Sequence, residues 1–167
     1  MSKSAQERLN ELAADTMAGK YDSPQSAAEA LNNDEALMDF AKAAGKEIWA
    51  VIDQKTFSIK EVGVGSSSSA RGVYLGSYRG GDSVWHTHPG GGDIHSGDWN
   101  SAYLEGGRGS AAYIFASGDR LTGYNMRAHS LPFSSAGGYR NYSGSWRFEK
   151  LIFSNGSWSS INGSFSK

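Results

Sequence analysis

Apolar positions in the first 45 residues recur at helical spacing and predict three short helices. Ser4 and Glu7 fit a capping box, which marks the start of the first helix. Ser23 precedes Pro24, a residue suited to the first helical position, and Asp34 can cap the third helix. The positions expected to face the core are Leu9, Leu12, Ala13, Met17, Ala27, Ala28, Leu31, Leu37, Met38 and Ala41.

After residue 45 the apolar pattern changes to the alternation that is typical of strands. A Gly/Ser segment at 65–72 is too polar to pack and predicts a loop. Ser96 can cap a short helix at 97–104, and Asn155-Gly156 is a strong hairpin signal. Strands are expected at 47–53, 56–64, 73–78, 82–88, 111–116, 121–125 and 145–153, and from 157 onward.

These elements predict a single α+β domain over residues 1–167. Helices come first, and a mostly antiparallel, mixed sheet with one inserted helix follows. The domain divides into a helical lead-in at 1–45, a core at 46–125 and a β-rich tail at 126–167.

The composition excludes several classes of protein. A net charge of −1 with no basic run argues against a nucleic-acid partner. No cysteine is present, so any metal site must rest on His, Asp and Glu side chains. No apolar stretch approaches the roughly 20 residues that span a bilayer, and the N-terminus has no apolar segment of the signal-peptide kind. We therefore expect a soluble protein made in the cytoplasm.

Three of the four histidines fall within ten residues of one another. His86 and His88 are two positions apart on an expected strand, so both side chains point to one face, and Pro89 ends that strand. His95 and Asp98 follow a glycine-rich loop, with Asp98 at the opening of the next helix. An isolated His-x-His is usually a pair of surface histidines. Two histidines and a carboxylate around one ion, however, are typical of a catalytic zinc site, and this context favours the metal.

The run His86–Pro89 (His-Thr-His-Pro), followed by Ser96 and Asp98, is similar to the signature of the JAMM zinc metallopeptidases, also called MPN-domain or JAB-type proteins. That signature is His-x-His-Pro, six or seven residues, then Ser-x-x-Asp. The strand that begins at Glu47 resembles the one that carries the family's glutamate. The order of elements resembles the JAB-like toxin domains at the C-termini of bacterial polymorphic toxins. The resemblance covers roughly residues 20–125 and implies a cytidine-deaminase-like JAB/MPN architecture.

One position departs from the family pattern. The spacing to Ser96 is that of the family, but the aspartate would then fall at position 99, which is Trp99. Either Asp98 is the ligand, with His95 or Ser96 in the serine place, or Asp93 or His95 takes the aspartate's role. We favour Asp98, because a helix start would fix its carboxylate.

The resemblance implies that Zn²⁺ is held by the two histidines of the run and by Asp98. Glu47 is expected to take a proton from the attacking water and to pass it to the leaving amine. Glu61, on the next strand, is the rival for this role. Ser96 is expected to donate a hydrogen bond to the oxyanion.

By the same resemblance, the protein is expected to be a zinc-dependent hydrolase of peptide or isopeptide bonds. It would act as a bacterial toxin or effector, exported by a specialised secretion system, on a protein or peptide substrate. A cognate immunity protein would block it. Two other functions remain open: a catalytically inactive JAMM-like scaffold that binds a partner, and a zinc amidase that acts on a non-protein substrate.

The remaining candidate residues are expected to be structural. Asp119 and Arg120 form a hairpin turn, and His129 lies outside any motif and is expected to be exposed. The tryptophans are expected to pack in the core or on a sheet face, and they are Trp49, Trp85, Trp99, Trp146 and Trp158.

Overall fold

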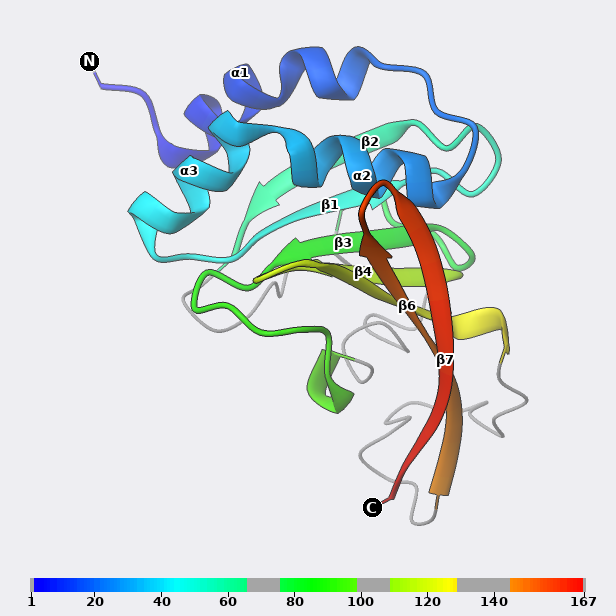
Figure 1. The fold of residues 1–167 in the computed structure, drawn as a ribbon. Coiled ribbons are helices and arrows are strands. Elements are labelled where there is room, and N and C mark those ends of the chain that lie inside the picture. Colours follow the sequence, from blue (N-terminus) through cyan, green and yellow to red (C-terminus); the bar gives the residue numbers. More distant parts are fainter. Residues whose placement is uncertain (1, 66–75, 99–108, 129–144, 167) are drawn as a thin grey trace.

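The computed structural model describes residues 2–65, 76–98, 109–128 and 145–166. Within these ranges, three N-terminal helices lie on one face of a seven-stranded mixed sheet (Figure 1). The fold is therefore α+β, as the sequence predicts. Among the described residues, no helix is both long enough and apolar enough to cross a membrane.

The helix starts follow the predicted capping residues. The Ser4 hydroxyl accepts a hydrogen bond from the Glu7 N–H at 3.1 Å, and the Glu7 carboxylate accepts one from the Ser4 N–H at 3.3 Å. The Asp34 carboxylate accepts from the Leu37 N–H at 3.2 Å. The capping box and the aspartate cap are thus confirmed. The three helices are α1 (Ala5–Ala18), α2 (Pro24–Asn33) and α3 (Glu35–Ala44).

One of the predicted inward positions is wrong. Leu12 is 40% exposed, whereas the other nine are buried or packed against the core. Helix α1 buries Leu9 and Ala13, which are one turn apart. Only these two residues of α1 are buried, so Leu12 lies beside the buried face of the helix and not on it.

Gln6, in the first turn of α1, bonds to the edge strand of the sheet. Its side-chain N–H donates to the Val62 carbonyl at 2.9 Å, and its side-chain oxygen accepts from the Val64 N–H at 3.2 Å. The amide thus takes the hydrogen-bonding place of a neighbouring strand, which protects an otherwise open edge.

The sheet runs in the order β2-β1-β3-β4-β5-β6-β7, and every neighbouring pair except one is antiparallel. Strands β3 and β4 are parallel, so the chain between them must cross over. The strands are β1 (Ile48–Ile52), β2 (Ile59–Val64), β3 (Ser83–Thr87), β4 (Tyr113–Ser117), β5 (Leu121–Asn125), β6 (Ser145–Ser154) and β7 (Ser157–Ser166).

Strand β2 begins three residues later than predicted. The Asp53 carboxylate accepts hydrogen bonds from the N–H groups of Lys55 and Thr56, both at 2.8 Å, and holds this stretch as a turn. Phe57 then adopts a φ of 62°, which no strand allows.

The strand predicted at 73–78 is wrong in its described part, 76–78, and its first three residues lie outside the described ranges. A carboxylate takes a backbone donor that a strand would need, because Glu61 accepts from the Ser77 N–H at 3.1 Å. Directly after the predicted strand, Asp82 accepts from the Arg79 N–H at 2.9 Å and holds a turn. Of the helix predicted at 97–104, only its start is described, and residues 96–98 are helical.

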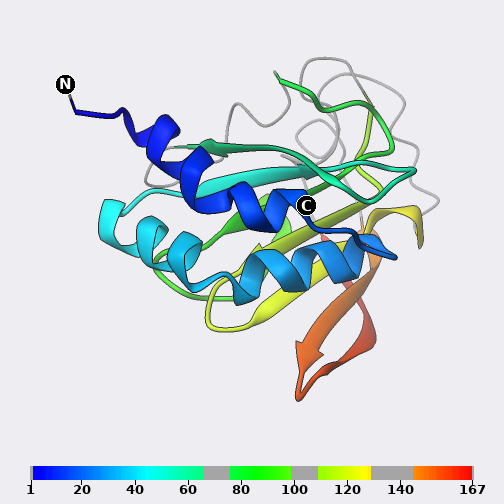
Figure 2. The same cartoon turned by 90° about the horizontal axis from the view of Figure 1, so that it is seen from above.

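The two faces of the sheet have different surroundings. Ile48, Ala50 and Trp85 pack with apolar side chains of the helices into one core. Trp49 pairs with His86 across β1 and β3, so these two lie on the opposite face. Figure 2 shows the three helices covering the sheet from above. The histidines therefore lie on the side away from the helices.

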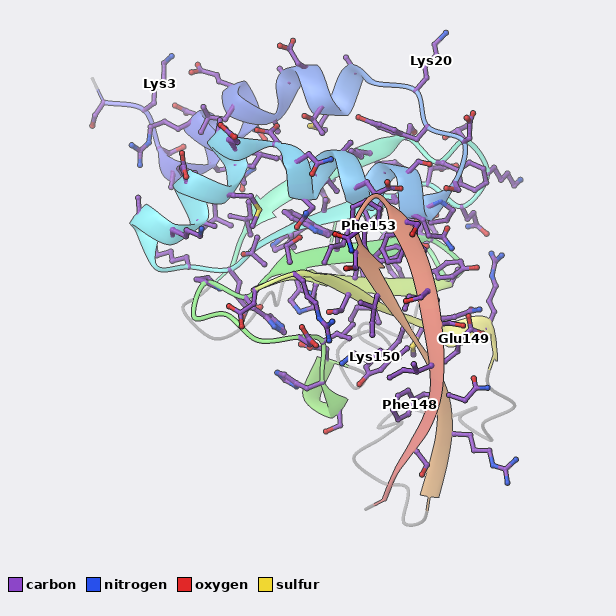
Figure 3. The ribbon with its side chains drawn as sticks, viewed as in Figure 1. Lys3, Lys20, Phe148, Glu149, Lys150 and Phe153 are labelled. Carbon is purple, nitrogen blue, oxygen red and sulfur yellow. The ribbon has the colours of Figure 1, made fainter. Side chains whose placement is uncertain are left out.

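The C-terminal hairpin extends the sheet and returns to the helices. Asn155 and Gly156 have φ values of 53° and 80°, as the predicted Asn-Gly hairpin turn requires. The ring of Trp158 is tilted by 47° against that of Phe153, which is labelled in Figure 3, with centroids 5.2 Å apart. The indole N–H of Trp158 donates to Glu29 on α2 at 3.2 Å. This contact ties the last hairpin to the N-terminal helices.

Candidate metal centre

The pairing of β1 with β3 brings the candidate residues from three parts of the chain together. Trp49 pairs with His86, and the Ile48 N–H donates to the Thr87 hydroxyl at 2.9 Å. Continued by two residues from the Trp49–His86 pair, this antiparallel register sets Glu47 opposite His88. The His88 N–H donates to the Ser117 carbonyl at 2.7 Å, which keeps its backbone extended beyond the end of β3.

Three side-chain atoms converge on one point. Nε2 of His86 lies 3.0 Å from Nε2 of His88 and 3.0 Å from Oδ1 of Asp98, and Nε2 of His88 lies 3.4 Å from the same oxygen. Ligands at zinc distances of 2.0–2.1 Å stand about 3.3 Å apart in a tetrahedral site. The three side chains are 8–12% exposed. Their spacing and chemistry are thus those of a group that could hold a divalent metal ion.

Glu47 lies beside these atoms. It is buried, and a carboxylate oxygen of Glu47 and one nitrogen each of His86 and His88 all lie within 4.8 Å of one another. Burial raises the pKa of the Glu47 carboxyl, an effect that the two imidazoles only partly offset. A raised pKa makes this carboxylate a stronger proton acceptor.

The electrostatics favour a positive charge where the ligand atoms meet. Burial raises the pKa of Asp98, but the hydrogen bonds with His86 and His88 outweigh it and hold the pKa well below its usual range. Burial lowers the pKa of His88, and its hydrogen bond and charge contact with Asp98 reverse this and raise it. Each partner thus favours the charged form of the other.

Asp98 is held in place by a helix cap that involves His95. The His95 N–H donates to Oδ2 of Asp98 at 3.0 Å, and Nδ1 of His95 accepts from the Gly97 N–H at 3.1 Å. The arrangement is similar to a capping box, with His95 as the cap and Asp98 three residues on, except that His95 accepts from the second helical residue, Gly97. The prediction of Ser96 as the cap was therefore wrong: Ser96 is the first helical residue. Asp98 comes one residue earlier than the signature described above would place it, and this cap explains how its carboxylate still reaches His86 and His88.

His88 is oriented by the glycine-rich loop. Its Nδ1 lies 3.3 Å from the Gly92 carbonyl oxygen, which leaves Nε2 to face the other ligand atoms. The Gly92 N–H donates in turn to Asp119 at 3.1 Å. Gly118 lies so close that a Cβ there would collide with the Gly92 carbonyl oxygen. The turn between β4 and β5 thus supports the position of His88.

Asp93, the substitute ligand, is engaged elsewhere. Arg120 forms a two-pronged ion pair with it, the shortest contact being 2.8 Å. Lys150, labelled on β6 in Figure 3, lies 3.2 Å from the same carboxylate. Asp119 and Arg120 therefore have the structural role that the sequence predicts, since both fix the loop that precedes Asp98.

The remaining candidates occupy other places. Glu61 bonds the Ser77 backbone and does not belong to either group of possible metal ligands among the described residues. Ser96 is half-buried, two residues before Asp98, and its role as an oxyanion donor stays a prediction. Trp99 and His129 lie outside the described residues.

Sequence reasoning missed Tyr124 as a neighbour of this centre. It is buried on β5, and burial, followed by the charges of Asp98 and Asp93, raises its pKa to about 12. Strand alternation could have placed Tyr124 on the same face as Thr122. Only the sheet register, which pairs Thr122 with Ala116 and Ala116 with His86, shows which face that is.

In comparisons with known proteins, the chain matches no family model, no curated protein and no solved structure. The interpretation of the site therefore depends on its own geometry.

Proposed function

We propose that this protein is a zinc-dependent hydrolase of peptide or isopeptide bonds, with His86, His88 and Asp98 as the metal ligands. The observation that carries this proposal is the convergence of their three ligand atoms at 3.0–3.4 Å. The buried carboxylate of Glu47 lies beside them, as a hydrolase of this kind requires.

Zinc held here would act as a Lewis acid and lower the pKa of water toward about 7. Glu47 accepts a proton from the attacking water and delivers it to the leaving nitrogen. The water oxygen joins the carbonyl carbon, the C–N bond breaks, and an amine and a carboxylic acid are released. Ser96 donates to the oxyanion that forms on the carbonyl oxygen.

The JAB/MPN architecture belongs to the same proposal. Its support is the succession of an antiparallel β1–β2 pair with Glu47 at its start, a strand that ends in the histidines, and a parallel return through β4. The role as a bacterial effector with a cognate immunity protein rests on the resemblance of the sequence to JAB-like toxin domains.

Glu47→Gln is the test of this proposal, because it removes the proton acceptor and leaves the three ligands. We expect zinc binding to persist, while cleavage of labelled casein or of an isopeptide-linked ubiquitin dimer falls by about 10² or more. Glu61→Gln is the matched control, since Glu61 lies on the next strand and bonds Ser77. It should change neither property.

Two results would overturn the proposal. Purified protein that takes up no zinc when the metal is added would exclude the metal centre. Protein that binds one equivalent of zinc and cleaves neither substrate, nor any peptide of a mixed library, would exclude the hydrolase and leave a binding scaffold.

A further inference from the structure

His95 is not needed to hold the first ion, yet it lies against the ligand cluster. Its side chain is 65% exposed, and its ring stacks on that of His88 with centroids 5.3 Å apart and an interplanar angle of 24°. Structural capping of the helix accounts for its Nδ1 contact with Gly97. It does not account for an exposed imidazole stacked on a candidate ligand.

The two oxygens of Asp98 share His88 as a neighbour, at 3.4 Å from Oδ1 and 3.3 Å from Oδ2, and differ in the other histidine that each approaches. Oδ1 lies 3.0 Å from Nε2 of His86, at the buried side of the cluster. Oδ2 lies 3.7 Å from Nδ1 of His95, at the exposed side. A carboxylate placed in this way can bridge two cations, as in two-metal sites with ions about 3.5–4 Å apart.

The described residues offer a second set of ligand atoms. One atom each of His88, His95 and Asp98 lie within 4.8 Å of one another, so this set shares His88 and Asp98 with the proposed zinc ligands and adds His95. Imidazole and carboxylate suit zinc and other late divalent transition metals.

We propose that a second divalent transition-metal ion binds at the exposed side of this centre, held by His95 and by Oδ2 of Asp98 beside His88, and that it inhibits the enzyme. The inference rests on the proposed function, because the inhibited site is the hydrolytic one. The second ion would cover the solvent-facing side of the ligands, from which a substrate carbonyl must approach.

The second ion binds more weakly than the first. Nδ1 of His95 already accepts a hydrogen bond from the Gly97 N–H, and coordination would replace that bond. An exposed side chain also gives up more hydration and rotamer freedom than the buried His86 when it is fixed on a metal. Zinc binding should therefore proceed in two separate steps.

His95→Asn is the variant that tests this site. Asparagine is a favoured N-cap residue, so it keeps an acceptor for the start of the helix while it removes the imidazole. Calorimetric titration of the metal-free chain with Zn²⁺ should give two classes of site in the wild type. In the variant, the second class should weaken at least about tenfold.

Activity provides the second measurement. The cleavage rate of the wild type should rise up to one equivalent of zinc and fall with further zinc. The variant, scaled to its own maximum, should not show the fall.

The outcomes separate the two proposals. One class of zinc site in both proteins, with no inhibition by excess zinc, refutes the second site and leaves the hydrolase standing. Two classes in both proteins place the second ion elsewhere and also refute it. No bound zinc in either protein refutes the proposed function itself.

Discussion

The carboxylate of Asp119 accepts a hydrogen bond from the backbone N–H of Gly92 at 3.1 Å. The contact joins the turn between β4 and β5 to the loop that follows β3, and the Gly92 carbonyl faces Nδ1 of His88. A hydrogen-bond partner that does not touch the metal itself fixes the tautomer and the orientation of a metal-binding imidazole. The β4–β5 turn is therefore part of the candidate metal centre, although none of its side chains is among the candidate ligands.

Gly118→Ala should weaken zinc binding by about 10- to 100-fold. The added Cβ would collide with the Gly92 carbonyl oxygen and displace it from His88. Gly90→Ala is the matched control, because a Cβ at Gly90 meets nothing within 4 Å. Competition with a fluorescent chelator measures both affinities. Equal affinities in the two variants would contradict a role for this turn.

Zinc should stabilise the folded chain. At a free zinc concentration 100 times the dissociation constant, the free energy of unfolding should rise by about 2.7 kcal/mol, provided that the unfolded chain does not bind the metal. Thermal unfolding with added zinc, and again after a chelator removes it, measures the gain. His86→Ala should abolish the shift, whereas Glu61→Gln should keep it. A shift that survives in His86→Ala would mean that the ion binds elsewhere.

Acid should remove a stabilising contribution of Asp93. The hydrogen bond from Arg120 is the main cause that lowers its pKa, with a further contribution from Lys150. Its folded pKa lies below its unfolded one, so the contribution is complete above the ordinary pKa of aspartate and is lost as the pH falls through the folded value. Asp93→Asn should therefore be less stable than the wild type at neutral pH, and the gap should close in acid. Urea unfolding at several pH values measures this, and a gap that stays constant with pH would contradict it.

Ser117→Ala should destabilise the fold by about 1–3 kcal/mol, because it leaves a buried N–H unpaired. The indole N–H of Trp85 donates to the Ser117 hydroxyl at 2.8 Å, and both side chains are buried. The double variant with Trp85→Phe should lose less stability than the sum of the two single losses, since it removes the unpaired donor as well. Chemical denaturation of all four proteins gives the coupling. Additive losses would show that this bond contributes nothing of its own.

Local signals predicted the helices and most of the strands. The box formed by Ser4 and Glu7 and the cap at Asp34 act within four residues, so the sequence contains all that determines them. The described part, 76–78, of the strand predicted at 73–78 was wrong because Glu61, distant in the sequence, takes a backbone donor of that segment. Alternation of side chains does not reveal a competitor of this kind.

For the same reason, the sequence predicted the candidate ligands but not which residues from other strands lie around them. His86, His88 and Asp98 form a short motif, and the structure places their ligand atoms together. Their neighbours, such as Asp119 and Tyr124, depend on how β3, β4 and β5 align, which no local pattern specifies.

The parallel pair β3–β4 has a consequence for how this protein can diversify. Parallel neighbours cannot be joined by a tight turn, so the chain must cross over between the end of β3 and the start of β4. In Figure 1 the described start of this crossover, in green, lies below the strands, away from the helices. His88 and Asp98 lie on this crossover, whereas the hydrogen bonds between neighbouring strands are made by the strands themselves. Insertions and exchanges along it can reshape what reaches the centre, while the hydrogen bonds that hold the sheet stay the same.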